Sequence, residues 1–425
     1  MKTGSMRNYD DLIKNYSISE GSIWAYPLKD PMYELPQFGF KIHLSATILN
    51  AADIFKRVVA ILEEGAASYK VISSLQNLAI LNSGDYGYSQ IGKFITIYPK
   101  DEQHLNELLE RLYCATLGFR SVEIPSDFRY KNSEVVYYRY GELRLPETAK
   151  KSTDLRRRWL PKGVVVPVDD YYVPRYTRMP ENYRPLICLR TRGKSRVFQG
   201  IDALRQRPVV IKEGRLLGEI TSDGYDGVSG VMQEKSILTA LSDISAFPSL
   251  IDFFYVGSSF VIIEEYRSGQ TMKKLFEDKQ YSTITAHKET ILIQLLHLLE
   301  ILHQRQICIG DLSLDNIILG EDGTVSLIDV EYYRSYQHSE NHIPGTAGFW
   351  CRDYSGNQAV IYAFFSLWYY LTFPYEYNRF MQEEKNMYIN RLQEYQKICS
   401  EAACIMAMED HGSAISALHT YLKGT

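Results

Sequence analysis

The chain has 425 residues, with 47 basic and 51 acidic side chains and a formal net charge of −4. This length predicts two or three domains, and the near balance of charge provides no whole-chain electrostatic case for binding nucleic acid or a membrane surface. Six cysteines without metal-like spacing predict free thiols in a reducing, cytoplasmic compartment and no zinc site. The longest apolar run, 359–371, is too short to cross a bilayer easily and predicts a buried helix.

The first region is predicted to be a mixed α and β domain. Alternating or β-rich residues predict strands over 39–45, 94–98 and 135–140, and helical spacing predicts helices over 50–65 and 101–117. Asn50 stands at the N-cap position of the first helix. These elements place a domain at 37–142, after an N-terminal extension over 1–36.

Basic side chains recur through this predicted domain. Lys41 and His43 share one face of the first strand, because side chains alternate along a strand. Four of the basic residues that follow are further candidates for the same site, and they are Lys70, Lys93, Arg129 and Arg139. A Lys-x-His pair is weak evidence by itself, since a histidine on a strand is more often structural and basic residues on strands are often solvated.

Residues 143–185 contain six prolines and little periodicity, so they are predicted to be an irregular linker. From residue 186 onward, strands, a helix, further strands and then helices follow in order. This order predicts a strand-rich lobe at 186–268 and a helical lobe at 269–425. The whole chain is therefore predicted to be an α+β multidomain protein.

The stretch from Gly310 to Asp329 carries two acids and one amide in a pattern suited to phosphoryl transfer. Asn316 lies five residues after Asp311, and Asp329 lies thirteen residues after Asn316. Phosphoryl transfer needs a carboxylate that orients the attacking hydroxyl and oxygen ligands that hold Mg²⁺ against the nucleotide phosphates. The pattern resembles the catalytic loop and metal-binding aspartate of the protein-kinase superfamily. The resemblance implies that Asp311 is catalytic and that Asn316 and Asp329 bind the metal.

The stretch also departs from the common protein-kinase pattern. Gly310 stands where most protein kinases have Arg, Ser313 stands where they have Lys, and residues 330–331 are Val-Glu where they have Phe-Gly. Val360 replaces the aspartate that braces the catalytic loop, and the substrate-side loop over 345–349 lacks the Pro-Glu that usually follows. These departures argue against regulation by a phosphorylated activation loop, but they leave the chemistry in place.

Five residues that precede this stretch in the chain extend the resemblance to the nucleotide site of a protein kinase. Lys212 follows two β-branched residues, as the phosphate-pairing lysine does, and Glu234 lies in the helix that would hold it by an ion pair. Gly193 and Val197 occupy the position of the phosphate loop, with one glycine where two or three are usual. Glu265 lies at the end of the strand that would meet the base. Surface helices are rich in Glu and Lys, so the assignment depends on finding all these residues in kinase order.

The basic residues of the first domain, taken with the Gly-Asp-Leu-Ser form of the catalytic loop, resemble the phosphothreonine-lyase and kinase domains of class III lanthipeptide synthetases. The resemblance implies β-elimination of phosphate from phosphoserine or phosphothreonine, with Lys70 as the base and His43 as the acid. The implied phosphate ligands are Lys41, Lys93, Arg129 and Arg139. Neighbouring cations are expected to lower the pKa of Lys70 and make it a usable base.

The resemblance predicts a bifunctional enzyme that uses ATP or GTP with Mg²⁺ to phosphorylate Ser and Thr of a precursor peptide with a leader segment, and then eliminates the phosphate. Family members usually continue into a cyclase domain, so we expect either a longer protein from which it was removed or a separate cyclase partner. One alternative is a small-molecule kinase of the aminoglycoside-phosphotransferase type, which leaves Lys41, His43 and Lys70 unexplained. Another is a leader-peptide-binding scaffold with an inactive kinase, which conflicts with the retained kinase residues.

Overall fold

The computed structural model describes residues 9–28, 34–143, 164, 179–335, 345–382 and 390–424. The chain divides into two compact units, each discontinuous in sequence. Unit 1 comprises Met1–Leu204, Ile211–Ser229 and Phe254–Val261, and unit 2 comprises Arg205–Val210, Gly230–Phe253 and Ile262–Thr425. Helices and separate sheets occur together throughout, so the predicted α+β multidomain class is confirmed.

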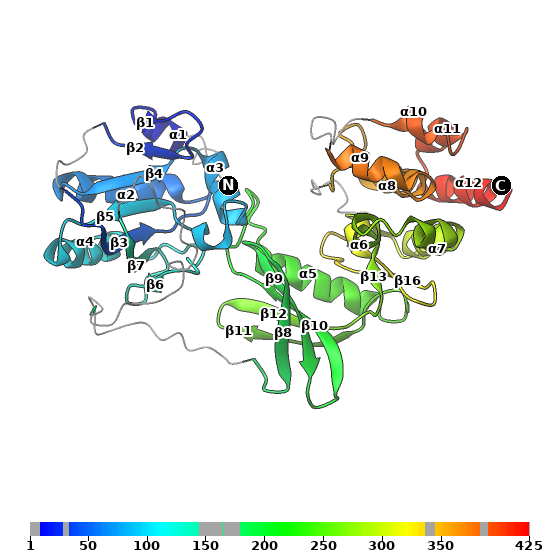
Figure 1. The fold of residues 1–425 in the computed structure, drawn as a ribbon, viewed down its shortest axis with the longest axis horizontal. Coiled ribbons are helices and arrows are strands. Elements are labelled where there is room, and N and C mark those ends of the chain that lie inside the picture. The colour runs from blue at the N-terminus through cyan, green and yellow to red at the C-terminus, as the bar shows by residue number, and fades with distance from the viewer. Residues whose placement is uncertain are drawn as a thin grey trace. The chain divides into compact units, whose positions relative to one another are not determined.

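A seven-stranded sheet dominates the first 142 residues (Figure 1). In spatial order its strands are β1 (Ser17–Ile18), β2 (Trp24–Tyr26), β4 (Ser68–Ile72), β5 (Ile95–Tyr98), β3 (Phe38–Leu44), β7 (Val136–Glu142) and β6 (Phe128–Arg129). Every neighbouring pair is antiparallel. The accompanying helices are α1 (Tyr9–Leu12), α2 (Ala51–Glu64), α3 (Leu75–Ser83), α4 (Glu102–Ala115) and the 3₁₀ turn η2 (Tyr88–Gln90). The strands and helices predicted for this region are therefore present, with ends shifted by one or two residues.

One face of this sheet forms the hydrophobic core. Ile42, Val71 and Ile97 are fully buried from three different strands, and they join one cluster with apolar residues of α2 and α4. The periodicity of α2 predicted this face, and Asp101 caps α4 by accepting a hydrogen bond from the His104 backbone N–H at 2.8 Å. Because side chains alternate along each strand, the residues between these apolar positions point to the opposite face.

The first 36 residues, expected to precede the domain, supply two strands of its sheet. β2 pairs with β4, and β1 pairs with β2. Tyr9 of α1 is fully buried, and its hydroxyl donates to the Ile72 carbonyl at 2.5 Å. Each of the two strands is too short to show an alternating pattern in sequence, which explains why the prediction placed the domain start at residue 37.

The next region forms a five-stranded sheet in the order β11-β12-β10-β9-β8. Its elements are β8 (Tyr183–Thr191), β9 (Ser195–Asp202), β10 (Arg207–Gly214), α5 (Gly227–Ala240), β11 (Leu250–Val256) and β12 (Ser259–Glu265). β8 begins inside the stretch predicted as a linker over 143–185. Most of that stretch lies outside the described residues.

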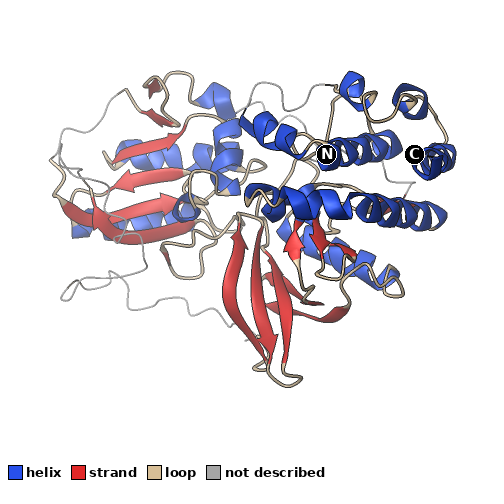
Figure 2. Ribbon diagram, turned by 45° about the vertical axis from the view of Figure 1, so that its right-hand side comes forward, coloured by secondary structure: helices blue, strands red, loops and turns tan. Residues whose placement is uncertain are grey.

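The C-terminal part is mainly helical (Figure 2). Its helices are α6 (Met272–Glu277), α7 (Tyr281–Gln304), η4 (Leu314–Asn316), α8 (Gly356–Thr372), α9 (Pro374–Gln382), α10 (Leu392–Tyr395), α11 (Ala402–Met406) and α12 (His411–Gly424). Two small sheets carry β13 (Gln270–Thr271), β15 (Ile317–Leu319) and β16 (Val325–Leu327), and β14 (Ile307–Cys308) with β17 (Arg334–Ser335). The apolar run 359–371 lies in α8 and is almost entirely buried, as predicted.

No helix within the described ranges is both long and apolar enough to cross a membrane. All six cysteines are free thiols, as their spacing predicted.

Candidate active sites

The first candidate site is a row of side chains across the face of the seven-stranded sheet opposite Ile42, Val71 and Ile97. The strand register places Lys70 opposite Thr96, Thr96 opposite His43, and His43 opposite Tyr137. Tyr137 in turn lies opposite Arg129. The expected base, acid and one phosphate ligand, which are 27 to 86 residues apart in sequence, therefore share one cross-strand row.

A second row lies beside the first on the same face. Lys41 is paired directly with Arg139, and the Lys41 Nζ lies 5.7 Å from the centre of the Tyr98 ring. Neighbouring strands are about 5 Å apart, so only one intervening strand, or about 10 Å, separates the backbones of Lys70 and His43. Long side chains at these positions can meet a phosphorylated residue from opposite ends.

His43 has a buried carboxylate partner that the sequence analysis did not assign. Its Nδ1 is hydrogen-bonded to Asp127 Oδ2, and the two residues are 3% and 0% exposed. The Ser126 hydroxyl donates to Asp127 Oδ1 at 2.7 Å, and the Lys93 Nζ lies 3.7 Å from the same oxygen. Lys93 is thus buried beside Asp127, and its predicted contact with phosphate stays a prediction. The only sequence signal for Asp127 is its place two residues before Arg129.

Charge in this network favours an ionised Asp127 and a neutral His43. Burial by itself raises the pKa of Asp127, but His43 and Lys93 together hold it well below its usual value. Burial lowers the pKa of His43 to about 4, against the opposing pull of Asp127. Since an ionised carboxylate only accepts hydrogen bonds, His43 Nδ1 is the donor to Asp127, and Nε2 is the ring nitrogen that remains to exchange a proton. A phosphate dianion beside Nε2 would favour the imidazolium that an acid role requires.

Lys70 has the lowered pKa that a base needs. Burial lowers the pKa of Lys70 to about 8, and Lys41 adds to the effect. The expected direction is present, but burial contributes more than the crowding of cations that was predicted. The pKa of Lys41 is also lowered to about 8, by burial and then by Arg139. Both lysines can therefore lose a proton near neutral pH.

The second candidate site is built around Asp311. The Asn316 side-chain amide donates to Asp311 Oδ2 and to the Asp311 backbone carbonyl, both at 3.1 Å. The Thr346 hydroxyl donates to the same Oδ2 at 2.9 Å. Burial raises the pKa of Asp311 to about 6, with Asp329 adding to the rise and Thr346 opposing it. The sequence analysis assigned no role to Thr346, although it placed residues 345–349 in the substrate-side loop.

The loop that carries Asp329 is tied to two other predicted residues of unit 2. Its neighbour Ile328 donates a backbone hydrogen bond to the Asn316 carbonyl at 2.9 Å. On its other side Val330 donates to Glu234 Oε1 at 3.1 Å. Asp329 itself has a left-handed φ of 61°, a conformation that Asp tolerates and that often marks functional loops.

The donor atoms near Asp329 fit a magnesium ion. Because Asn316 uses its amide nitrogen toward Asp311, its side-chain oxygen remains for a metal. Mg²⁺ prefers oxygen ligands and commonly combines one or two carboxylates with substrate phosphates. Asn316 and Asp329 would then hold the ion, as the kinase resemblance implies.

Gly310 has a structural reason to lack a side chain. A Cβ at this position would lie 2.1 Å from the Tyr332 carbonyl oxygen, which is closer than real Cβ contacts allow. The chain that follows Asp329 therefore occupies the space that the usual kinase arginine would need.

Gly310→Ala is expected to lower the free energy of unfolding by about 1–3 kcal/mol, because the added methyl group must displace backbone atoms. Urea unfolding followed by circular dichroism measures the change. Gly141→Ala is the matched control, since its added Cβ would meet nothing closer than 3.8 Å. Equal stability of the two variants would contradict the steric explanation.

Lys212 and Glu265 occupy the strands predicted for them. Lys212 lies in β10 and is 7% exposed; its ion pair with Glu234 stays a prediction. Glu265 ends β12, and its backbone N–H donates to the Ser249 carbonyl at 2.9 Å. That N–H is therefore already used, so a nucleotide base would have to meet other backbone groups nearby.

Gly193 is required by packing inside unit 1. Its N–H donates to the Ser83 carbonyl at 2.8 Å, and a Cβ would lie 1.7 Å from the Asn82 carbonyl oxygen. Val197 pairs with Arg190 in the adjoining β8–β9 hairpin. The end of α3 thus explains the glycine without a nucleotide, and the phosphate-loop role of Gly193 and Val197 stays a prediction.

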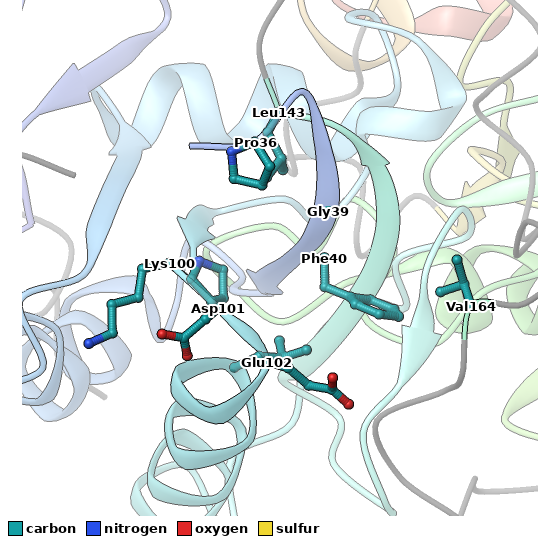
Figure 3. Close-up of a pocket in the computed structure, with 10 residues that line it drawn as sticks. Pro36, Gly39, Phe40, Lys100, Asp101, Glu102, Leu143 and Val164 are labelled. Carbon is teal, nitrogen blue, oxygen red and sulfur yellow. The ribbon is translucent and has the colours of Figure 1, made fainter. Parts of the chain in front are cut away.

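A separate cavity of about 400 Å³ lies beside the first residues of β3, an interior strand of the seven-stranded sheet (Figure 3). It is lined by the start of β3, including Gly39 and Phe40, and by Lys100, Asp101 and Glu102 at the N-terminal end of α4. None of the predicted site residues lines it. This cavity is therefore separate from both candidate sites.

Two protein families match this chain, and their matches meet at residue 192. The family described as the N-terminal domain of RamC matches residues 6–192, and the protein kinase domain matches residues 192–360. A probable SapB synthase from Streptomyces coelicolor is 25% identical over 348 residues, which are 74% of this chain and 37% of that protein. Serine/threonine-protein kinase C from Synechocystis is 39% identical over 83 residues, or 19% of this chain and 15% of that protein. The chain thus aligns with little more than a third of the SapB synthase.

Proposed function

Because this chain joins a RamC N-terminal domain to a protein kinase domain, we propose that it is the dehydrating part of a lanthipeptide synthetase. The kinase domain transfers the γ-phosphoryl group of ATP or GTP to Ser and Thr of a precursor peptide. The N-terminal domain then eliminates the phosphate and leaves dehydroalanine or dehydrobutyrine.

The observation that carries the elimination step is the shared sheet face. Elimination needs a base for the α-proton and an acid for the leaving oxygen, together with cations around the phosphate. Lys70 and His43 lie in one cross-strand row with Arg129, and Lys41 and Arg139 lie in the next. A small-molecule kinase would have no use for this set.

In the elimination step, Lys70 takes the α-proton and the resulting electron pair forms the carbon–carbon double bond. The bond from the β-carbon to the phosphate oxygen breaks, and His43 donates a proton to that oxygen from Nε2. Lys41, Arg129 and Arg139 neutralise the phosphate, and Arg can do so by paired hydrogen bonds.

Support for the kinase step comes from the environment of Asp311. Its carboxylate is oriented by Asn316 and Thr346, as a residue that accepts the proton of a substrate hydroxyl must be. Mg²⁺ would supply charge neutralisation at the phosphates, held by Asn316 and Asp329. The precursor peptide with its leader segment would be the common substrate of both sites, and a cyclase would act on the product.

The test is to incubate the protein with Mg²⁺, ATP or GTP and a Ser-rich precursor peptide, and to measure the peptide mass. Loss of water at Ser and Thr is the expected result. A peptide that gains phosphate without losing water would overturn the elimination step. Phosphorylation of aminoglycosides with no change to the peptide would favour the small-molecule kinase.

The rate of elimination is expected to rise with pH through a midpoint near 8. Only the neutral amine of Lys70 can take a proton, and its pKa of about 8 means that the neutral fraction grows as pH increases. The measurement is kcat at a saturating concentration of a synthetic phosphothreonine peptide, because bound phosphate favours the protonated His43 that the acid role requires. This assay needs no nucleotide. A rate that decreased between about pH 7 and pH 9 would contradict the base assignment.

A further inference from the structure

An aromatic ring lies against the expected base. Trp24 in β2 is paired with Ile72 of β4, so it is the diagonal cross-strand neighbour of Lys70 on the same sheet face. The Lys70 Nζ lies 4.2 Å from the centre of the Trp24 ring. This contact joins the proposed base to a residue within the segment that the sequence analysis treated as an extension.

We propose that Trp24 is a positioning residue for elimination, which holds the Lys70 amine over its ring and stabilises the ammonium that forms when the α-proton is taken. The inference rests on the proposed elimination by the N-terminal domain. Trp24 would act on the Lys70 amine and would not contact the phosphate.

The physical basis is the change of charge at Nζ. The face of an indole ring carries negative electrostatic potential and attracts an ammonium within about 6 Å of its centre. A neutral amine is attracted less. Because Lys70 becomes positive as the reaction proceeds, the attraction is stronger in the transition state than in the ground state, and only such a difference accelerates the chemical step.

The ring has a second effect, because it also covers the amine. Burial is the largest cause of the lowered pKa of Lys70, while the attraction between ring and ammonium acts in the opposite direction. Burial lowers the pKa of Lys70 to about 8, and the ring adds to this burial by covering the amine. Trp24 therefore helps to keep Lys70 neutral before the reaction and compensates the charge that develops during it.

The segment that carries Trp24 is held in place on both sides. The Trp24 backbone N–H donates to the Ser22 hydroxyl oxygen at 3.0 Å, and Ser73 donates to the Ile23 carbonyl at 2.9 Å. Upstream, the Asp10 carboxylate accepts a hydrogen bond from the Leu75 backbone N–H at 2.9 Å. These contacts fix β2 against β4, so the ring is positioned before substrate binds.

The test compares Trp24→Phe, Trp24→Leu and Trp24→Ala in elimination from a synthetic phosphothreonine peptide. We expect Phe to retain most of kcat, and Leu, which keeps apolar cover without a ring, to lower kcat about tenfold with little change in KM. Ala also exposes the amine, so the midpoint of the pH profile moves upward from about 8. Phe38→Leu removes an aromatic ring from the opposite face of the same sheet and is the matched control.

Equal kcat for the Leu variant and the wild-type protein, with Lys70→Met inactive, would overturn the inference while leaving the proposed function in place. Absence of elimination by the wild-type protein would overturn both. If the Ala variant fails to fold, kcat and thermal stability of the Phe and Leu variants still test the inference. A packing role predicts that kcat decreases in parallel with stability, whereas the proposed role predicts a lower kcat for Leu even where stability is retained.

Discussion

Asp311→Asn is expected to leave the precursor peptide without phosphate and therefore without dehydration. The amide cannot accept the proton of the attacking hydroxyl, and loss of a general base costs about 10²–10⁴ in rate. It also disturbs the hydrogen bonds that Asn316 and Thr346 donate to Asp311 Oδ2. Peptide mass after incubation with Mg²⁺ and ATP or GTP is the measurement.

The same Asp311→Asn protein should still eliminate phosphate from a synthetic phosphopeptide, because the elimination residues belong to unit 1 and Asp311 belongs to unit 2. Asp315→Asn is the matched control in the same loop. Asp315 is exposed and paired with Lys273 at 2.9 Å, and such surface pairs contribute little. Normal phosphorylation by Asp311→Asn would rule out the assigned role.

Lys70→Met is expected to make phosphopeptide accumulate. The kinase step remains, but the α-proton of the phosphorylated residue has no base, so the elimination rate should decrease by about 10²–10⁴. Methionine preserves most of the length and apolar volume of the lysine, which limits damage to the packing against Trp24. Mass spectrometry distinguishes phosphorylated from dehydrated peptide, and the signature of the variant is gain of phosphate without loss of water.

Two further lysine variants test whether the loss of elimination is specific to Lys70. Lys56→Met changes an exposed lysine of α2 and should dehydrate the peptide normally. Lys41→Met tests the other lysine whose pKa is lowered to about 8. If Lys41 binds phosphate, its loss should raise KM for the phosphopeptide more than it lowers kcat. If Lys41→Met lost elimination and Lys70→Met retained it, Lys41 would be the base and Lys70 would be the phosphate ligand.

Local sequence patterns predicted several of the elements that carry the candidate sites, including the strand of Lys41 and His43, but not β4 with Lys70 or β6 with Arg129. The alternation at Lys41 and His43 placed them on one face, and the apolar spacing of 50–65 predicted the helix that covers the other face. The spacing of Asp311, Asn316 and Asp329, through its resemblance to protein kinases, also placed these residues in one predicted site. These signals are local, because helical and strand periodicities are read within a few residues.

Partners from distant segments were missed for the opposite reason. Asp127 is 84 residues from His43, and Thr346 is 35 residues from Asp311. Trp24 lies in a three-residue strand, which is too short to show a period. A single sequence contains no signal for these contacts, since each depends on how strands and loops are brought together.

The sequence by itself determined the order of the two domains, the residue types of both candidate sites and the face on which Lys41 and His43 lie. Only the tertiary structure decided which groups surround them. Strand register sets Lys70, His43 and Arg129 in one row, and burial, more than neighbouring charge, lowers the pKa of Lys70. Periodicity belongs to the local chain, whereas register and burial exist only when distant strands pair and exclude water.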